Sequence, residues 1–318
     1  MSFDIQYLLF LQTLRELTGG IFDETFNAIS KLAVDIIPFL PFIVYWSTNK
    51  KWGLRYLLTF YGADLFNGVL KLTVCAYRPW IRSDLIEPAG DSKVAATGYS
   101  FPSGHTVSAT CNYGNTFVWQ KNRNKKLATL CVVLIALTAF SRNFLGVHTP
   151  QDVIVGFLEG VLLIYLTGKF INKYEGDDKK LDLFSILGIV IIILSIIYIL
   201  FKPYPMDYVD GKLLVDPHVM MNDTFKGAGG LLGLIVGLYF DRHYIHYEIP
   251  KHHESLPMLT FVGFVIIFSW KELFAPAIML AAFGGHWGNF IARFILVLFA
   301  TTVWPMIITK VCKQKENK

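Results

Sequence analysis

The chain has 318 residues, of which 53% are hydrophobic and 17% are charged, and its formal net charge is +5. Its mean hydropathy is +0.46. This composition excludes an ordinary soluble domain, because several stretches approach the roughly 20 apolar residues that a helix needs to cross about 30 Å of hydrocarbon. The sequence therefore predicts an all-α polytopic membrane helical bundle. The expected partner is the lipid bilayer, and no nucleic-acid partner is expected.

Residues 1–22 combine apolar residues with acidic ones, which predicts an amphipathic segment at the membrane interface rather than a cleavable signal peptide. The clearest span is the apolar run LFSILGIVIIILSIIYILF at 183–201. Two other predicted spans, 226–240 and 257–270, are short. Nine membrane spans are predicted in all, at residues 25–47, 53–76, 103–120, 127–146, 150–168, 183–201, 226–240, 257–270 and 288–309.

An odd number of spans places the two termini on opposite sides of the membrane. Lys and Arg concentrate in one set of alternate loops, such as 121–126, 169–180 and 310–318. Because loops rich in Lys and Arg stay in the cytoplasm, we expect a cytoplasmic C-terminus and an external N-terminus. The loop at 77–102 and the link at 143–149 then share the outer face. A bacterial cytoplasmic membrane is the expected location, and an endoplasmic-reticulum membrane with a lumenal site is the alternative.

Two cations, Lys71 and Arg78, lie in the second predicted span and at its end. A spacing of seven residues is nearly two helical turns, so both side chains leave the same helix face, about 10 Å apart along the axis. Two such cations repel each other unless they share an anion, and intramembrane charges are functional candidates by default. The alternative is structural: Arg78 reaches up to the membrane surface and Lys71 pairs with Asp64.

The stretch SFPSGHT, at 100–106, precedes the third predicted span. Ser103 is a natural helix N-cap, and the free N–H groups of a helix start bind anions with help from the helix dipole. Gly104 lets a ligand approach the backbone closely, and His105 stands beside that position. The alternative is a capped helix start with a bystander histidine.

The stretch SRNFLGVHTPQD, at 141–152, ends the fourth predicted span and begins the fifth. Thr149 is predicted to be the N-cap of the fifth span. Asp152 follows His148 by four residues, so its carboxylate can reach one ring nitrogen and make the other nitrogen more basic. Arg142 lies six residues before His148. The alternative, which does not exclude the first reading, is that Asp152 closes a capping box with Thr149.

Two further features are assigned a packing role. Gly229, Gly233 and Gly237 recur every four residues, which predicts a flat stripe where another helix approaches closely. Asp35 and Arg293, two charges within predicted spans, are expected to form interior pairs or to lie near span ends, and a role in transport is the alternative.

The three polar segments are expected to converge on the outer face. Their cations and backbone donors suit a phosphoryl group, whose charge spreads over several oxygens. Two histidines supply a nucleophile and a proton donor. The four cysteines, Cys75, Cys111, Cys131 and Cys312, show no metal-binding spacing, so neither a metal nor a cofactor is expected.

Together, KLTVCAYRP (71–79), PSGH (102–105) and SRNFLGVHTPQD (141–152) resemble the three signatures of the type 2 phosphatidic acid phosphatases, the PAP2 superfamily, which is related to the vanadium haloperoxidases. All three segments occur in order with the internal spacings of the family, over roughly residues 60–165. The nine-span layout is similar to that of the glucose-6-phosphatase and sphingosine-phosphate phosphatase branches.

The resemblance also implies a chemistry. His148 attacks phosphorus and becomes a phosphohistidine, Asp152 orients His148, and His105 protonates the leaving alcohol. The phosphate oxygens would be held by Lys71, Arg78, Ser103, Gly104 and Arg142. The implied enzyme is a metal-independent phosphoric monoester hydrolase that acts on a lipid phosphate or pyrophosphate at the outer membrane face.

Three alternatives remain open: a phosphotransferase of the same mechanism, a sugar-phosphate phosphatase, and a non-catalytic lipid transporter or scaffold. The sequence does not indicate the oligomeric state. The resemblance implies three regions, namely an interfacial segment at 1–22, a PAP2-like membrane catalytic core at 23–170, and additional membrane helices of unknown role at 171–318.

Overall fold

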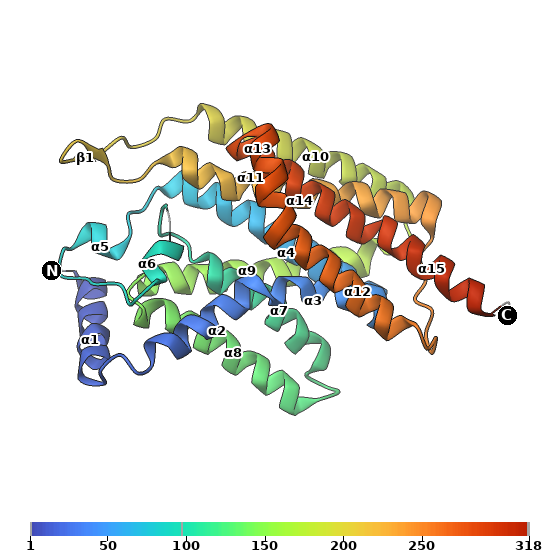
Figure 1. Ribbon diagram of the computed structural model, residues 1–318, viewed down its shortest axis with the longest axis horizontal. Helices are drawn as coiled ribbons and strands as arrows, with labels where there is room; N and C mark the ends of the chain where they lie inside the picture. The colour runs from blue at the N-terminus through green and yellow to red at the C-terminus, as the bar shows by residue number, and fades with distance from the viewer. Residues whose placement is uncertain (1, 97, 317–318) are drawn as a thin grey trace. The chain divides into compact units, whose positions relative to one another are not determined.

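The computed structural model describes residues 2–96 and 98–316, and nearly all of its regular structure is helical (Figure 1). The exception among the described elements is a short antiparallel hairpin, in which β1 (Tyr208–Val209) pairs with β2 (Lys212–Leu213). The predicted all-α fold class is confirmed for this part of the chain.

The helices follow one another along the chain, and four short 3₁₀ or π-helical turns join or extend them. The α-helices are α1 (Phe3–Leu17), α2 (Asp23–Asp35), α3 (Leu40–Ile43), α4 (Lys50–Val74), α5 (Pro79–Arg82), α6 (Ser92–Ala95), α7 (Gly104–Gln120), α8 (Lys125–Phe144), α9 (Pro150–Tyr174), α10 (Asp178–Phe201), α11 (Pro217–Phe240), α12 (Leu256–Ser269), α13 (Ala275–Phe283), α14 (Gly285–Thr301) and α15 (Val303–Glu316). The turns are η1 (Ile37–Phe39), η2 (Val44–Thr48), η3 (Asp241–Ile245) and η4 (Trp270–Phe274).

Six helical stretches of the described chain are long and apolar enough to cross a membrane, and each overlaps a predicted span. The other three predicted spans fall on α4, α7 and α11. These helices are less apolar or shorter, because α4 carries Asp64 and Lys71, α7 has 17 residues, and α11 carries Asp223 and Lys226. The predicted total of nine spans is therefore not confirmed. The six stretches are Asp23–Thr48, Lys125–Phe144, Pro150–Tyr174, Asp178–Phe201, Leu256–Ala277 and Gly285–Lys313.

The chain divides into two compact units. Both α4 and α9 run from one unit into the other. The predicted regions 1–22, 23–170 and 171–318 follow a different division and remain a prediction. Unit 1 consists of Met1–Pro38, Phe66–Ile164 and Phe201–Met221, and unit 2 consists of Phe39–Leu65, Tyr165–Leu200 and Asn222–Lys318.

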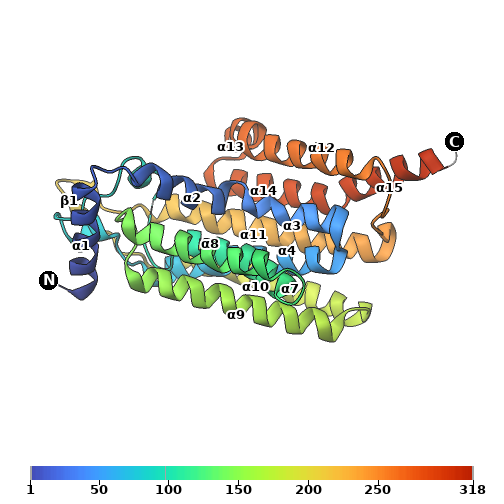
Figure 2. The ribbon, with the colours of Figure 1, turned by 90° about the horizontal axis from the view of Figure 1, so that it is seen from below.

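In unit 1, α7 packs along α8, and α2 contacts both of these helices (Figure 2). The helix α9 approaches α7 through two glycines. A Cβ atom at Gly156 would lie 2.8 Å from the carbonyl oxygen of Ser103, and one at Gly160 would lie 2.6 Å from Thr110 Cβ. Because any larger side chain would force the two helices apart, these glycines hold the first turns of α9 against the first turns of α7.

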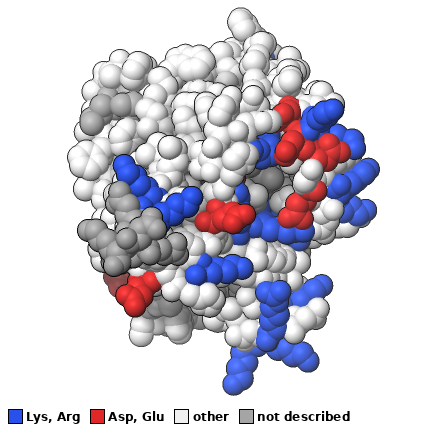
Figure 3. Space-filling view, turned by 90° about the vertical axis from the view of Figure 1, so that its right-hand side faces the viewer, with Lys and Arg blue, Asp and Glu red and all other residues white. Residues whose placement is uncertain are grey.

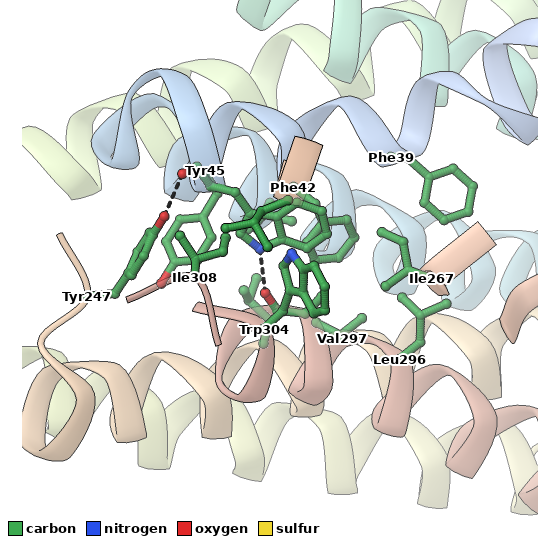
Figure 4. Close-up of a cluster of buried hydrophobic side chains, with 14 of the residues drawn as sticks. Phe39, Phe42, Tyr45, Tyr247, Ile267, Leu296, Val297, Trp304 and Ile308 are labelled. Carbon is green, nitrogen blue, oxygen red and sulfur yellow. Dashed lines mark hydrogen bonds between the residues drawn. The ribbon is translucent and has the colours of Figure 1, made fainter. Parts of the chain in front are cut away.

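In unit 2, aromatic and aliphatic side chains from segments far apart in the sequence form one buried cluster (Figure 4). Trp46 lies within it, and its indole Nε1 donates a 2.7 Å hydrogen bond to the carbonyl oxygen of Ala300. The hydroxyl of Tyr247 donates to the carbonyl oxygen of Trp46. Both polar groups of these large side chains are thus satisfied inside the cluster, as buried donors require.

The glycine stripe of α11 packs against α14 within unit 2. A Cβ atom at Gly233 would lie 2.6 Å from the carbonyl oxygen of Phe294, so the predicted close helix approach is confirmed. Arg293, also on α14, interacts with the Tyr61 hydroxyl and with the carboxylate of Asp64.

Figure 3 shows Lys and Arg side chains, and some Asp and Glu side chains among them, on the face that it draws. Several basic residues of unit 2 form exposed ion pairs, including Lys51 with Glu175 and Lys180 with Asp177. Such exposed pairs contribute little to stability. The orientation that the loop charges predict remains a prediction.

Candidate active site

Three polar segments of unit 1 meet at one end of its helices: the end of α4, the start of α7, and the link between α8 and α9. The side chains of Lys71, Arg78, Arg142, His148 and Asp152 are all buried. Ser103 is buried as well, whereas Gly104 and His105 are partly exposed. The structure thus brings together the eight residues that the sequence singles out.

His148 and Asp152 face each other across the first turn of α9. The Nδ1 atom of His148 lies 3.4 Å from Asp152 Oδ2. The same carboxylate oxygen accepts a 2.8 Å hydrogen bond from the backbone N–H of Thr149 and a 2.5 Å hydrogen bond from the hydroxyl of Ser100. Asp152 therefore combines both roles considered from the sequence, because it caps the helix start and also faces the imidazole.

Arg78 contacts the other side of the same imidazole. Its Nη1 atom lies 2.8 Å from His148 Nε2, and it also donates a 2.9 Å hydrogen bond to the carbonyl oxygen of Val147. A guanidinium can only donate, so Nε2 of His148 must be the acceptor. The ring proton is therefore assigned to Nδ1, which faces Asp152. Arg78 is 5% exposed, so its side chain is buried within this site.

The electrostatic surroundings of His148 favour a neutral ring. His148 lies in the link between α8 and α9, outside the membrane-spanning stretches. Burial, and next the positive charge of Arg78, lower the pKa of His148 well below its usual value of about 6.5, although Asp152 acts in the opposite direction. A neutral imidazole with a free electron pair at Nε2 is the form that attacks an electrophile.

Lys71 connects the end of α4 to the loop before α7. Its ammonium group donates a 2.5 Å hydrogen bond to the carbonyl oxygen of Pro102 and a longer one, 3.4 Å, to that of Ser100. The ammonium group is therefore held beside the start of α7. A charged donor at this position can bind an anion that also contacts the N–H groups of the helix start.

Ser103 is the N-cap of α7, as predicted: its hydroxyl oxygen accepts a 3.5 Å hydrogen bond from the N–H of Thr106. Its own N–H donates 2.9 Å to the carbonyl oxygen of Asp152, which ties the two helix starts together. A Cβ atom at Gly104 would lie 3.3 Å from Asn67 Oδ1, so a side chain there would crowd the site. His105 lies within electrostatic range of the cationic side chains and of His148.

Arg142 is the most deeply buried of the three cations in the site. Its Nη1 donates a 2.6 Å hydrogen bond to the hydroxyl of Ser30 on α2. Its Nε and Nη2 are buried and have no hydrogen-bond partner among the described residues. Leaving a buried charged donor unpaired costs about 1–3 kcal/mol or more, so these two nitrogens are suited to bind a multivalent oxyanion.

The structure also reveals positioning residues that sequence reasoning missed. Ser100 donates to Asp152, and Asn143 donates a 2.9 Å hydrogen bond to the carbonyl oxygen of His148. Asn67 on α4 donates 3.0 Å to Glu159 on α9, and both side chains are buried. The signal available in the sequence was a carboxylate and an amide within apolar helices. Such side chains are rare in membrane spans unless they have a role. Ser30 gave no such signal.

Among the residues that the structure describes, no group of three or more His, Cys, Asp or Glu side chains is placed to hold a metal ion. The donor set around His148 consists instead of guanidinium, ammonium and backbone N–H groups, which bind anions.

One family model matches the part of the chain that carries the candidate site. Residues 52–175 match the model of the PAP2 superfamily. That range contains the three segments that form the site. No solved structure matches the chain significantly.

Several curated proteins are similar to the chain. Phosphatidylglycerophosphatase B of Bacillus subtilis is 33% identical over 140 residues, which cover 42% of this chain and 64% of that protein. Lipid phosphate phosphatase delta of Arabidopsis thaliana is 25% identical over 266 residues, covering 78% and 60%. Sphingosine-1-phosphate phosphatase 2 of Mus musculus is 24% identical over 242 residues, covering 74% and 62%. The chain thus spans less than two thirds of the length of these relatives.

Proposed function

We propose that this protein is an integral membrane phosphatase that hydrolyses a lipid phosphate or pyrophosphate through a phosphohistidine intermediate, because residues 52–175 match the model of the PAP2 superfamily. The observation that carries the proposal is the pairing of both His148 nitrogens: Nδ1 faces Asp152 and Nε2 faces Arg78. This pairing holds a neutral imidazole with its nucleophilic nitrogen aimed at a cluster of cations.

In the first step, His148 Nε2 forms a bond to phosphorus while the bond from phosphorus to the leaving alcohol oxygen breaks. The ring becomes positively charged, and the carboxylate of Asp152 stabilises it through Nδ1–H. His105 gives a proton to the leaving oxygen. Arg78 must turn its Nη1 from Nε2 towards the phosphate oxygens as the phosphoryl group arrives.

In the second step, water attacks the phosphorus of the phosphohistidine. His105, now without its proton, accepts one from that water, and the bond from phosphorus to Nε2 breaks. Free phosphate leaves and neutral His148 is restored. In both steps, charge that develops on the phosphoryl oxygens is stabilised by Lys71, Arg142 and the N–H groups at the start of α7.

The substrate class follows from the membrane setting and from the relatives. Each of the relatives named above acts, by its name, on a phosphorylated lipid. A membrane enzyme with its site at the ends of its helices can process a headgroup while the lipid tail stays in the bilayer. We assign the site to the outer membrane face, on the basis of the distribution of Lys and Arg among the loops.

The test is a phosphate-release screen with the purified full chain across lipid phosphates, lipid pyrophosphates and sugar phosphates, each with and without EDTA. Release from lipid substrates in EDTA, inhibited by vanadate, is the expected result. Activity that disappears with EDTA would reject the metal-free mechanism, and turnover of sugar phosphates alone would reject the lipid assignment. Phosphoryl transfer to an added alcohol in place of water would favour a phosphotransferase.

A further inference from the structure

Unit 1 contains an apolar groove of about 570 Å³ that the catalytic chemistry does not use. It lies between α7, α8 and α9, and we call it the tail groove. Its volume lies in the range of ligand-binding pockets, roughly 300–1,000 Å³. Lining residues that matter here are Gly114 on α7, Ala136 and Ala139 on α8, and Val153, Phe157 and Val161 on α9.

One end of the tail groove lies within about one helical turn of two residues of the candidate active site. Val153 follows Asp152 directly in the sequence, and Ala139 precedes Arg142 by three residues, about one helical turn. Two of the helices that carry site residues therefore continue as walls of the groove. A lipid whose phosphate contacts His148 would have the first part of its hydrocarbon chain at this end.

The length of the tail groove matches one leaflet of a bilayer. Its lining on α9 runs from Val153 to Ile164, which are eleven residue steps apart and therefore about 16 Å at 1.5 Å per residue. Half of a hydrocarbon core of roughly 30 Å is about 15 Å. A groove of this length therefore fits the extended chain of a lipid from the same leaflet as the site.

The lining of the tail groove is almost purely hydrocarbon. Its one hydroxyl-bearing residue, Thr110, donates that hydroxyl 2.7 Å to the carbonyl oxygen of Thr106 and so has no donor left for a ligand. A phosphate or sugar headgroup would lose its hydration there without a partner. The small side chains of Gly114, Ala136 and Ala139 create the space, whereas larger residues there would close it.

From this geometry we infer that the tail groove receives one hydrocarbon chain of the substrate lipid and thereby aligns its phosphate with His148. The inference rests on the proposed function and adds a substrate subsite to it. A second chain, where the lipid has one, stays in the surrounding bilayer. Because lipid tails are as apolar as the groove, the groove contributes alignment rather than affinity.

The first test narrows the groove with Ala136→Trp and uses Val133→Trp as the matched control. Val133 lies on the same helix, is 45% exposed and does not line the groove. Each variant is assayed with a long-chain lipid phosphate and with a water-soluble short-chain alkyl phosphate. Ala136→Trp should lower kcat for the long-chain substrate by about 10-fold or more, the size of effect that small misplacement causes, and should leave short-chain turnover unchanged.

Unchanged short-chain turnover shows that the Ala136→Trp variant is folded and has an intact active site. Val133→Trp should keep both activities. Equal losses for both substrates, or equal long-chain losses in both variants, would overturn the tail groove. If wild-type protein releases phosphate from no substrate at all, the proposed function fails instead. The tail groove is then tested by the crosslinking experiment that follows, which does not need turnover.

The second test does not need turnover. A lipid phosphate with a photoactivatable group in its chain is crosslinked to the full-length protein in vesicles, and a fatty alcohol with the same chain serves as the comparison. Labelling should concentrate at Phe157 and Val161 over Val133, and should be stronger for the phosphate lipid. Equal labelling by the alcohol would mean that the groove holds any membrane lipid, which would sink the inference.

Discussion

The guanidinium of Arg78 lies 2.8 Å from Nε2 of His148, and both side chains are buried. This contact assigns the ring proton to Nδ1, beside Asp152, and leaves Nε2 as the nucleophilic nitrogen. It also places a cation next to the atom that phosphorus would approach.

Replacing His148 by Ala removes the proposed nucleophile. We expect phosphate release from a lipid phosphate to fall by about 10³-fold or more, as for other residues that form a covalent intermediate. Vanadate should still bind to the variant, because the cations remain, and this binding controls for folding. A residual rate of about one tenth of wild type would remove His148 from the role of nucleophile.

Replacing Asp152 by Asn should cost less than the loss of His148, because the nucleophile itself remains. An amide in place of the carboxylate no longer stabilises the charged ring and can favour the wrong tautomer, so a fall in kcat of roughly 10²-fold to 10³-fold is expected. Ser100→Ala, which removes one donor to the same oxygen, should cost only about 10-fold. Equal losses for Asp152→Asn and His148→Ala in folded protein would contradict the orienting role.

The pH dependence of kcat/KM should reflect the low pKa of His148. Burial and Arg78 lower that pKa, so the ring stays neutral below pH 6.5, where a free histidine would already be mostly charged. The acidic limb of the profile, which reports the free enzyme, should therefore lie below about pH 6.5. The second ionisation of the substrate phosphate, followed by phosphorus NMR in the same micelles, serves as the correction. An acidic limb above pH 6.5 after this correction would argue against a neutral His148.

Arg142 should determine how tightly the site holds a phosphate mimic. Because its Nε and Nη2 have no partner among the described residues, bound vanadate should satisfy them and raise the thermal unfolding midpoint. Arg142→Lys should reduce this shift and weaken vanadate binding by about 10-fold or more, since one ammonium cannot replace two guanidinium donors. The control is Arg82→Gln, which removes a cation that pairs with Asp4. A loss of equal size in that control would point to nonspecific charge.

The hydrogen bond between Asn67 and Glu159 should hold α4 and α9 together beneath the site. Glu159→Ala leaves the buried amide of Asn67 without this acceptor and should lower the free energy of unfolding by about 1–3 kcal/mol. Glu159→Gln keeps a carbonyl acceptor and should restore most of that loss. Chemical denaturation in detergent, together with kcat/KM, measures both effects. Equal destabilisation by the two substitutions would show that the negative charge of Glu159, rather than its hydrogen bond with Asn67, stabilises the protein.

The three polar segments were predictable because each depends on short spacings along one stretch of the chain. A spacing of four residues puts His148 and Asp152 on one helix face, and Ser103 before a helix start predicts a cap. The number of spans was less predictable, because polar site residues lower the mean hydropathy of the helices that carry them. Lys71 on α4 illustrates this effect, since a charged site residue lowers the mean hydropathy of the helix that carries it.

The sequence by itself determined the helical class, the residue types of the candidate site and the order of its three segments, since each depends on composition or on short spacings along one helix. Only the tertiary structure decided which nitrogen of His148 faces Arg78, that Ser100 and Ser30 join the site, and that the tail groove lies beside it. These features arise where α2, α4, α7, α8 and α9 pack together. The physical reason is that the contact between two distant helices depends on how their whole surfaces fit, as at Gly156 and Gly160, and local periodicity carries no information about that fit.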